Sequence, residues 1–289
     1  MAAQRRSVEL SYVDEVNAWR TTRMAASAQL EGEIHGYADY WERTGGFTVR
    51  RELPHAEGVL IVNFADPIEI TGGDGCAIRL LAGEAFVAGV HTRSALSHST
   101  GTQAGIHVFL PLATVRRLLG VPMDELVDRV VPLDALLGRS ARELGDALGD
   151  ARGANSRAEI LDQVLEMALA RATPLDRRLT HALAVLRERP DRDIARVADD
   201  VGWSRKHLAA RVRDAVGVGP RSFRRLLRFQ TLTGLIGAAA GRPDWAALAL
   251  EAGYYDQSHM IREFGEFSGL TPGTYLARAL PNGGGLVEA

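Results

Sequence analysis

Two short stretches in the last third of the chain carry side chains that can hydrogen-bond to nucleic-acid bases. The candidates in the first stretch are Ser204, Arg205, Lys206, His207, Ala209 and Arg211, and those in the second are Gln257, Ser258, His259 and Arg262. Arg and Lys donate to guanine, Gln bonds adenine in a bidentate way, and alanine reads little except a thymine methyl. We therefore expect these residues to bind DNA, with sharper base reading by Gln257 and Arg262.

The two stretches lie in copies of one longer pattern. Gly202 and Gly253 are 51 residues apart, but after this turn the offset becomes 52, as between Leu208 and Met260. The same offset relates four later pairs, which are Val212 with Phe264, Gly217 with Gly269, Pro220 with Pro272, and Phe223 with Tyr275. Each copy predicts a helix, a glycine-containing turn and a second helix, the arrangement that lays a recognition helix into a DNA major groove.

Equivalent residues begin the second helix of each copy. Ser204 and Asp256 are both good N-caps, so each recognition helix is expected to start in the same way. His207 and His259 follow at equivalent positions and are expected to contact phosphate or to cap their own helix.

A helix over residues 221–237 is expected between the two copies, with a length of roughly 25 Å. It would hold the recognition helices about one DNA turn apart, ~34 Å between successive major-groove faces. Arg221, Arg225 and Arg228 fall on one side of this helix and are candidates for phosphate contacts. The expected partner is therefore double-stranded DNA, bound through two adjacent major grooves.

The charge distribution agrees with this partner better than the total charge does. The formal net charge is −2. Residues 174–289 contain 17 Lys and Arg against 13 Asp and Glu, a balance of +4, whereas residues 1–173 contain 17 against 23, a balance of −6. The basic half is thus the half with the repeat, as phosphate binding requires.

The preceding residues predict a different kind of domain. Tyr12, Val16 and Trp19 have helical spacing, so residues 1–30 are expected to form a leading helix or arm. From about 34 to 110, short runs rich in β-branched and aromatic residues alternate with glycine turns, which is typical of a β-sandwich or barrel. Helical periodicity returns after Pro111. The apolar stripe over residues 160–169 fits either packing on this barrel or a homodimer seam.

A family resemblance becomes specific at residues 253–264, Gly-Tyr-Tyr-Asp-Gln-Ser-His-Met-Ile-Arg-Glu-Phe, followed by Gly269-Leu270-Thr271-Pro272 and Tyr275. This stretch resembles the signature of the AraC/XylS family of bacterial transcription regulators. The resemblance to the family as a whole extends over about residues 174–280. The resemblance implies a seven-helix DNA-binding domain with two reading units. The first unit departs from the family pattern at Ala210 and Val212, where arginine and phenylalanine are common. Residues 35–41 and 130–134 are similar to the cupin-like sensor domains fused to such regulators.

The expected fold is accordingly α+β. It has an N-terminal arm at 1–30, a cupin-like β-barrel with trailing helices at 31–173, a C-terminal all-α domain at 174–280 with two helix-turn-helix units joined by a linker helix, and a tail at 281–289. The expected function is sequence-specific transcription regulation under a small-molecule effector whose binding residues are unknown. A homodimer is left open as an alternative, and RNA polymerase is expected as a partner if the protein is an activator.

Two alternatives remain open. The N-terminal domain could serve only for dimerisation or for binding a protein partner, or it could be a cupin-type metalloenzyme. The barrel region lacks a His-x-His pair with a following Glu at ligand spacing, so neither a metal nor a cofactor is expected, and no residue is assigned a catalytic role. Cys76, the single cysteine, is expected to be a small buried hydrophobe. With no long apolar run and no secretory signal, the expected location is the cytoplasm.

Overall fold

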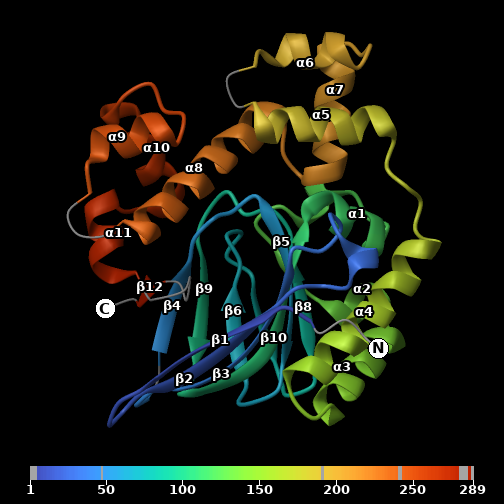
Figure 1. The fold of residues 1–289 in the computed structure, drawn as a ribbon, viewed down its shortest axis with the longest axis vertical. Coiled ribbons are helices and arrows are strands. Elements are labelled where there is room, and N and C mark those ends of the chain that lie inside the picture. Colours follow the sequence, from blue (N-terminus) through green and yellow to red (C-terminus); the bar gives the residue numbers. More distant parts are fainter. Residues whose placement is uncertain (1–4, 47, 190–191, 240–242, 280–285, 288–289) are drawn as a thin grey trace.

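The computed structural model has one part built of sheets with helices beside them and a second, mostly helical part, as the ribbon in Figure 1 shows. The structure describes residues 5–46, 48–189, 192–239, 243–279 and 286–287. The N-terminal part contains two antiparallel sheets and the helices beside them, and the C-terminal part is helical apart from one short strand. The expected α+β class is therefore confirmed. In the described ranges, no helix is both long and apolar enough to cross a membrane.

The larger sheet has seven strands. Their spatial order is β1 (Ser7–Val13), β2 (Ala18–Met24), β3 (Gly36–Arg43), β10 (Thr102–Pro111), β5 (Glu57–Asn63), β8 (Ala85–Ala88) and β11 (Val130–Pro132). The long strand β10 lies in the middle and pairs with β3 and β5. Ile106 and Val108 alternate with more exposed neighbours along β10, because successive side chains of a strand point to opposite faces.

The smaller sheet has five strands, in the order β12 (Leu286–Val287), β4 (Thr48–Glu52), β9 (Ala95–Ser99), β6 (Ile68–Thr71) and β7 (Ala77–Leu80). Ile70 and Leu80 of this sheet pack against Phe86 and Ala88 of the larger one. Among the described residues, no strand ladder joins the two sheets. The barrel expected from the sequence is thus a pair of facing sheets that remain open at their edges.

The N-terminal residues form a hairpin and not the expected helix. Asp14 makes the turn between β1 and β2, because its Oδ1 accepts hydrogen bonds from the backbone nitrogens of Val16 (2.8 Å) and Asn17 (2.6 Å). Val8, Leu10 and Tyr12 recur at every second residue on β1, which is the strand period. The helical spacing of Tyr12, Val16 and Trp19 was therefore incidental.

Helices cover the outer face of the larger sheet. They are α1 (Leu112–Leu119), α2 (Leu133–Leu137), α3 (Arg139–Asp150) and α4 (Ala154–Arg171), with the short 3-10 turns η1 (Ala28–Leu30) and η2 (Met123–Leu126). Leu161 and Leu165 of α4 are buried within this domain. Asp162 fixes α4 in place, since it accepts hydrogen bonds from the Tyr37 hydroxyl (2.7 Å) and the Ser27 backbone (3.0 Å). The apolar stripe of α4 packs on its own domain, and the homodimer seam expected as the alternative is wrong for these residues.

The C-terminal part consists of seven helices among the described residues. They are α5 (Arg177–Glu188), α6 (Ile194–Asp200), α7 (Arg205–Val216), α8 (Pro220–Ala238), α9 (Trp245–Glu251), α10 (Gln257–Ser268) and α11 (Pro272–Arg278). The expected linker helix is present as α8, and it begins with a proline at the first helical position, as α11 does. In Figure 1, α8 runs between the pair α6 and α7 and the pair α9 and α10.

Candidate nucleic-acid interface

The first reading unit consists of α6 and α7. Gly202 forms the turn between them with a φ of +66°, a conformation that L side chains rarely adopt. The Ser204 hydroxyl accepts a hydrogen bond from the His207 backbone nitrogen (3.1 Å), which is the N-cap expected from the sequence. The His207 ring packs edge-on against Trp203, with ring centroids 4.8 Å apart.

The second unit repeats each of these contacts. Gly253 has a φ of +83° in the turn between α9 and α10. The Asp256 carboxylate accepts a hydrogen bond from the His259 backbone nitrogen (2.6 Å). The His259 ring packs edge-on against Tyr254, with centroids 5.4 Å apart. The two units are therefore equivalent in the three contacts that start each recognition helix, although their sequences differ.

Both recognition helices bury one side and expose the other. Leu208 and Val212 of α7, like Met260 and Phe264 of α10, are fully buried. This spacing of four residues places each pair on one face of its helix. The polar first turn of each helix is left at the surface, where a groove of DNA can reach it.

Most of the candidate base-reading residues lie on these outer surfaces. Ser204, Arg205, Lys206, His207, Gln257, Ser258 and Arg262 are exposed, and Ala209, Arg211 and His259 are half-buried. The structure thus gathers the candidates into two patches, one at the N-terminal half of α7 and one at that of α10. The contact of His207 and His259 with an aromatic ring was not expected from the sequence.

The three candidate phosphate ligands on α8 differ in their surroundings. Arg221 is exposed, whereas Arg225 and Arg228 form ion pairs with the buried carboxylate of Glu263 on α10. The Arg225 Nε lies 2.7 Å from Glu263, and an Arg228 Nη lies 3.0 Å from it. Arg225 also pairs with Glu266. In this arrangement, two of the three cations hold α8 against α10.

Glu263 is a buried, ion-paired carboxylate beside the candidate interface that the sequence analysis did not single out. Although partial burial opposes the charge of Arg225, its hydrogen bonds to Glu263 and Glu266 raise the pKa of that guanidinium. Burial, followed by the negative charge of Glu263, also raises the pKa of the Tyr254 hydroxyl. The available signal was a glutamate four residues after His259 on the predicted recognition helix, close in space to the arginines predicted on the linker helix.

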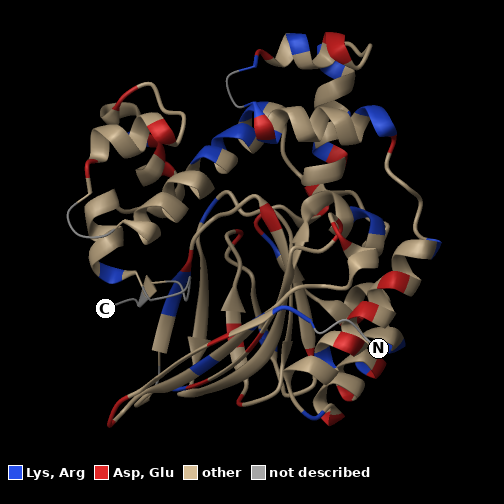
Figure 2. Ribbon diagram, in the orientation of Figure 1, with Lys and Arg blue, Asp and Glu red and all other residues tan. Residues whose placement is uncertain are grey.

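Basic residues concentrate on the part of the molecule that carries the first unit. Figure 2 shows Lys and Arg segments along the half of α8 nearest α5 and α7. The sheets and the helices beside them carry acidic and basic segments intermixed. The basic balance expected for the C-terminal half is thus located near the candidate reading surface.

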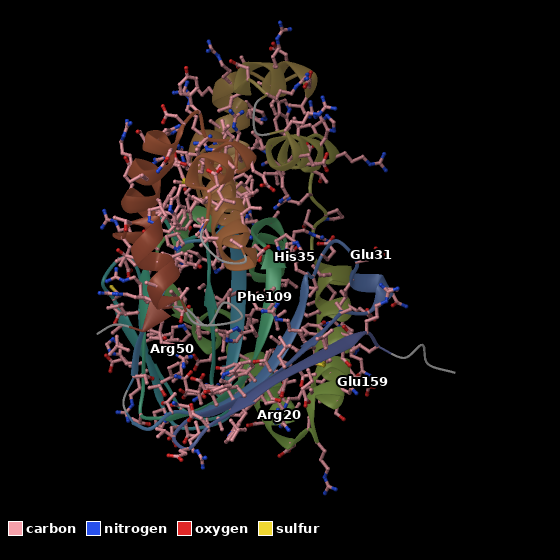
Figure 3. The ribbon with its side chains drawn as sticks, turned by 60° about the vertical axis from the view of Figure 1, so that its left-hand side comes forward. Arg20, Glu31, His35, Arg50, Phe109 and Glu159 are labelled. Atoms are coloured by element: carbon pink, nitrogen blue, oxygen red, sulfur yellow. The ribbon has the colours of Figure 1, made fainter. Side chains whose placement is uncertain are left out.

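A hollow of about 770 Å³ lies between the sheet domain and the helical domain. Its walls include Glu33, His35 and Arg117 on one side and Arg187 and Gln230 on the other. Figure 3 shows His35 at the end of the sheets nearest the C-terminal helices. The Gln230 side chain accepts a hydrogen bond from the Ala56 backbone (3.2 Å), which links α8 directly to the sheet domain.

The polar groups of this hollow are paired with one another. His35 Nδ1 lies 3.0 Å from a Glu57 oxygen, and Glu33 pairs with Arg117. Although burial opposes its charge, the hydrogen bond from His35 and the charge of that ring lower the pKa of Glu57. The hollow therefore offers an incoming molecule both charged and hydrogen-bonding groups.

The histidines and the cysteine of the sheet domain were weighed in the sequence as possible metal ligands or as buried residues, and their positions can now be described. Within the described residues, no group of three or more His, Cys, Asp or Glu side chains is arranged to hold a metal ion. His107 packs between the rings of Tyr40 (4.8 Å) and Phe109 (5.8 Å). Cys76 is exposed, so the expectation that it is a buried hydrophobe is wrong, because it lies in the tight turn between β6 and β7.

Comparisons with known proteins identify the C-terminal part. A family model described as a helix-turn-helix domain matches residues 197–278. This match begins within α6 and ends with α11, so it spans both recognition helices and confirms the expected helix-turn-helix domain. No curated protein matches the chain.

Several solved structures are similar at low identity. ToxT from Vibrio cholerae is 11% identical over 91% of this chain and 98% of that chain, with a TM-score of 0.49. ToxT with a bound unsaturated fatty acid is 10% identical over 81% of this chain and 96% of that chain, also with a TM-score of 0.49. An AraC-type regulator from Chromobacterium violaceum is 20% identical over 35% of this chain and 89% of that chain, with a TM-score of 0.31.

Proposed function

We propose that this chain, whose residues 197–278 belong to a helix-turn-helix domain family, is a sequence-specific transcription regulator under the control of a small-molecule effector. The observation that carries the proposal is the pair of recognition helices, α7 and α10, with matched caps and exposed polar first turns. Because its partner is genomic DNA, we place the protein in the cytoplasm.

The spacing of the two units suits adjacent major grooves. The 19 residues of α8 give it a length of about 28 Å. Successive major-groove faces on one side of DNA are ~34 Å apart. Helix α7 directly precedes α8, and α10 packs alongside it at Arg225 and Arg228, so we propose that one chain reaches both grooves without a second copy.

The two units are proposed to read bases unequally. Gln257 and Arg262 of α10 supply bidentate hydrogen-bonding groups for adenine and guanine. Arg205 and Lys206 of α7 are followed by alanines, which discriminate little beyond a thymine methyl. We assign phosphate contact to Arg221, and to Arg225 and Arg228 only as far as their ion pairs with Glu263 allow.

The DNA proposal is tested by selecting duplexes from a random pool with the full chain. Arg262→Ala should relax the preference at one base pair, at a cost of about 1–3 kcal/mol in discrimination. The exposed Arg221→Ala should instead weaken binding to all sequences equally and reduce the salt slope by about 1. If the wild-type chain enriches no sequence and protects no site in footprinting, the proposal is wrong.

We propose the hollow between the domains as the effector site. Its walls come from both domains, so a bound molecule would change how the sheet domain holds α8. A ligand that binds only the folded protein raises its unfolding temperature in a saturable way. Thr231→Trp, on the wall of the hollow, should abolish this shift, whereas Ser222→Trp, exposed elsewhere on α8, should preserve it. A ligand that stabilises both variants equally would place the site elsewhere.

A homodimer is a further part of the proposal. Strand β1 forms one edge of the larger sheet and exposes Val8, Tyr12 and Val13. An edge strand of this kind offers unpaired backbone groups to a second chain. Val13→Lys should lower the molar mass measured by light scattering from that of a dimer to that of a monomer, and an unchanged mass would reject this edge as the interface.

A further inference from the structure

Both recognition helices end against the sheet domain. The C-cap of α7 is Gly217, with a φ of +84°. A β-carbon at this position would lie 2.6 Å from Val90 Cγ1 and 2.9 Å from the carbonyl oxygen of Met123. Near the same end, Arg116 of α1 pairs with Asp214 of α7 (3.3 Å). The C-terminal end of α7 is thus in close contact with the sheet domain, while its N-terminal end is exposed.

The C-terminal end of α10 has a matching contact on the other sheet. The C-cap here is Gly269, with a φ of +70°. Arg51 of β4 extends towards it, and its Nη1 is 3.8 Å from the place that a β-carbon on Gly269 would take. A guanidinium near the last carbonyls of a helix is favourable, because those carbonyls carry partial negative charge.

Strand β12 also attaches the second unit to β4, the strand that carries Arg51. Strand β12 pairs with β4 in antiparallel register, Leu286 opposite Arg51 and Val287 opposite Arg50. Figure 3 places Arg50 on this outer part of the smaller sheet. Leu286 is only 1% exposed, and it also forms a bridge with Ala279, just after α11. Helix α11 directly follows α10, so β12 ties the second unit to the sheet domain.

These contacts restrain two bodies that are otherwise joined by α8. Helix α8 already holds the second unit, through the ion pairs of Arg225 and Arg228 with Glu263 and the packing of Phe229 on Phe264. Attachment of both recognition helices to the sheet domain adds a second restraint on their relative angle.

From this arrangement we infer that the sheet domain sets the spacing and angle of the two recognition helices, and that the β12–β4 pairing makes binding selective for half-site spacing. Leu286 is the positioning residue for the second unit. The inference rests on the proposed DNA-reading function and adds to it a role for strand β12.

The test uses the full chain and the duplex that it selects from a random pool. A second duplex carries one extra base pair between the half-sites, which shifts and rotates the second half-site by about a tenth of a turn. We expect the wild type to bind the second duplex at least tenfold more weakly. Leu286→Asp should reduce this ratio to threefold or less, because the second unit is then held by α8 alone and can follow its half-site more closely.

Two controls separate pairing from folding. Leu81→Asp makes the same change at an exposed position of the sheet domain and should keep the wild-type ratio. Val287→Pro removes a backbone donor of β12 without adding charge and should lower the ratio, as Leu286→Asp does. Hydrogen exchange of the β4 amides should rise in both β12 variants and stay unchanged in Leu81→Asp.

The outcomes are distinct. If the variants bind DNA with the wild-type ratio, or if β4 exchange is unchanged, the inference is overturned while the proposed function stands. If the wild type selects no DNA at all, the proposed function fails, and spacing selectivity fails with it.

Discussion

At the scale of single residues, the sheet domain holds three partly or fully buried histidines whose pKa values are lowered. Burial, and to a smaller extent the nearby charge of His55, lowers the pKa of His107 to about 4. Burial also lowers the pKa values of His55 and His91. None of the three rings belongs to a metal-binding cluster among the described residues. The lowered pKa values of these histidines therefore make the free energy of unfolding depend on pH.

Acidification should destabilise the protein between pH 6.5 and 4. In this window the unfolded chain binds protons that the folded His107 does not, so the free energy of unfolding falls as the pH falls. For His107 the loss is up to about 3 kcal/mol. His107→Phe keeps the ring packing against Tyr40 and Phe109, and it should flatten the pH dependence seen in urea unfolding.

The control is His181→Phe, at an exposed position on α5, which should retain the wild-type pH profile. An unchanged slope in His107→Phe would mean that the buried ring does not govern the acid sensitivity.

At the scale of elements, the helix caps follow from local sequence and the strands do not. Ser204 and Asp256 cap the two recognition helices as their residue types predict. The hairpin of β1 and β2 was mistaken for a helix, because three apolar residues had a helical spacing by chance. Each cap needs only a neighbour three residues away, whereas the hairpin depends on the turn that Asp14 makes with Val16 and Asn17, which the apolar spacing does not report.

The two caps should differ in strength. Asp256→Ala should cost about 1–2 kcal/mol and Ser204→Ala about 0.5–1 kcal/mol of unfolding free energy, because only the carboxylate also interacts with the positive end of the helix. Thermal unfolding at low and high salt measures the difference. The excess for Asp256 should shrink in high salt, and an equal loss at both salt concentrations would contradict a charge contribution.

At the scale of the whole molecule, the two parts share an extensive contact. Val90 and Met123 of the sheet domain belong to the same buried cluster as Val216 and Val218 beside the first reading unit. The hollow, the Gln230 contact and the β12 pairing lie on this boundary. The sheet domain and the helical domain are therefore coupled by packing as well as by the chain that joins them.

Two glycines at positive φ test this coupling. Gly202→Ala, with open space around the added carbon, should cost about 1–2 kcal/mol from the left-handed backbone alone. Gly217→Ala, whose φ is also positive, meets Met123 and Val90 in addition, so it should cost more and separate the domains. Limited proteolysis should cleave between the domains faster in Gly217→Ala only, and equal cleavage of both variants would reject the close packing.

The sequence by itself determined the two reading units, their caps, the linking helix and the α+β class. These features depend on residue type and short-range periodicity, which act through contacts within a few turns of helix. Only the tertiary structure decided that Arg225 and Arg228 pair with Glu263, that the stripe of α4 is internal, and that β12 joins β4. Those contacts join residues from 35 to more than 200 positions apart, and no local pattern specifies such partners.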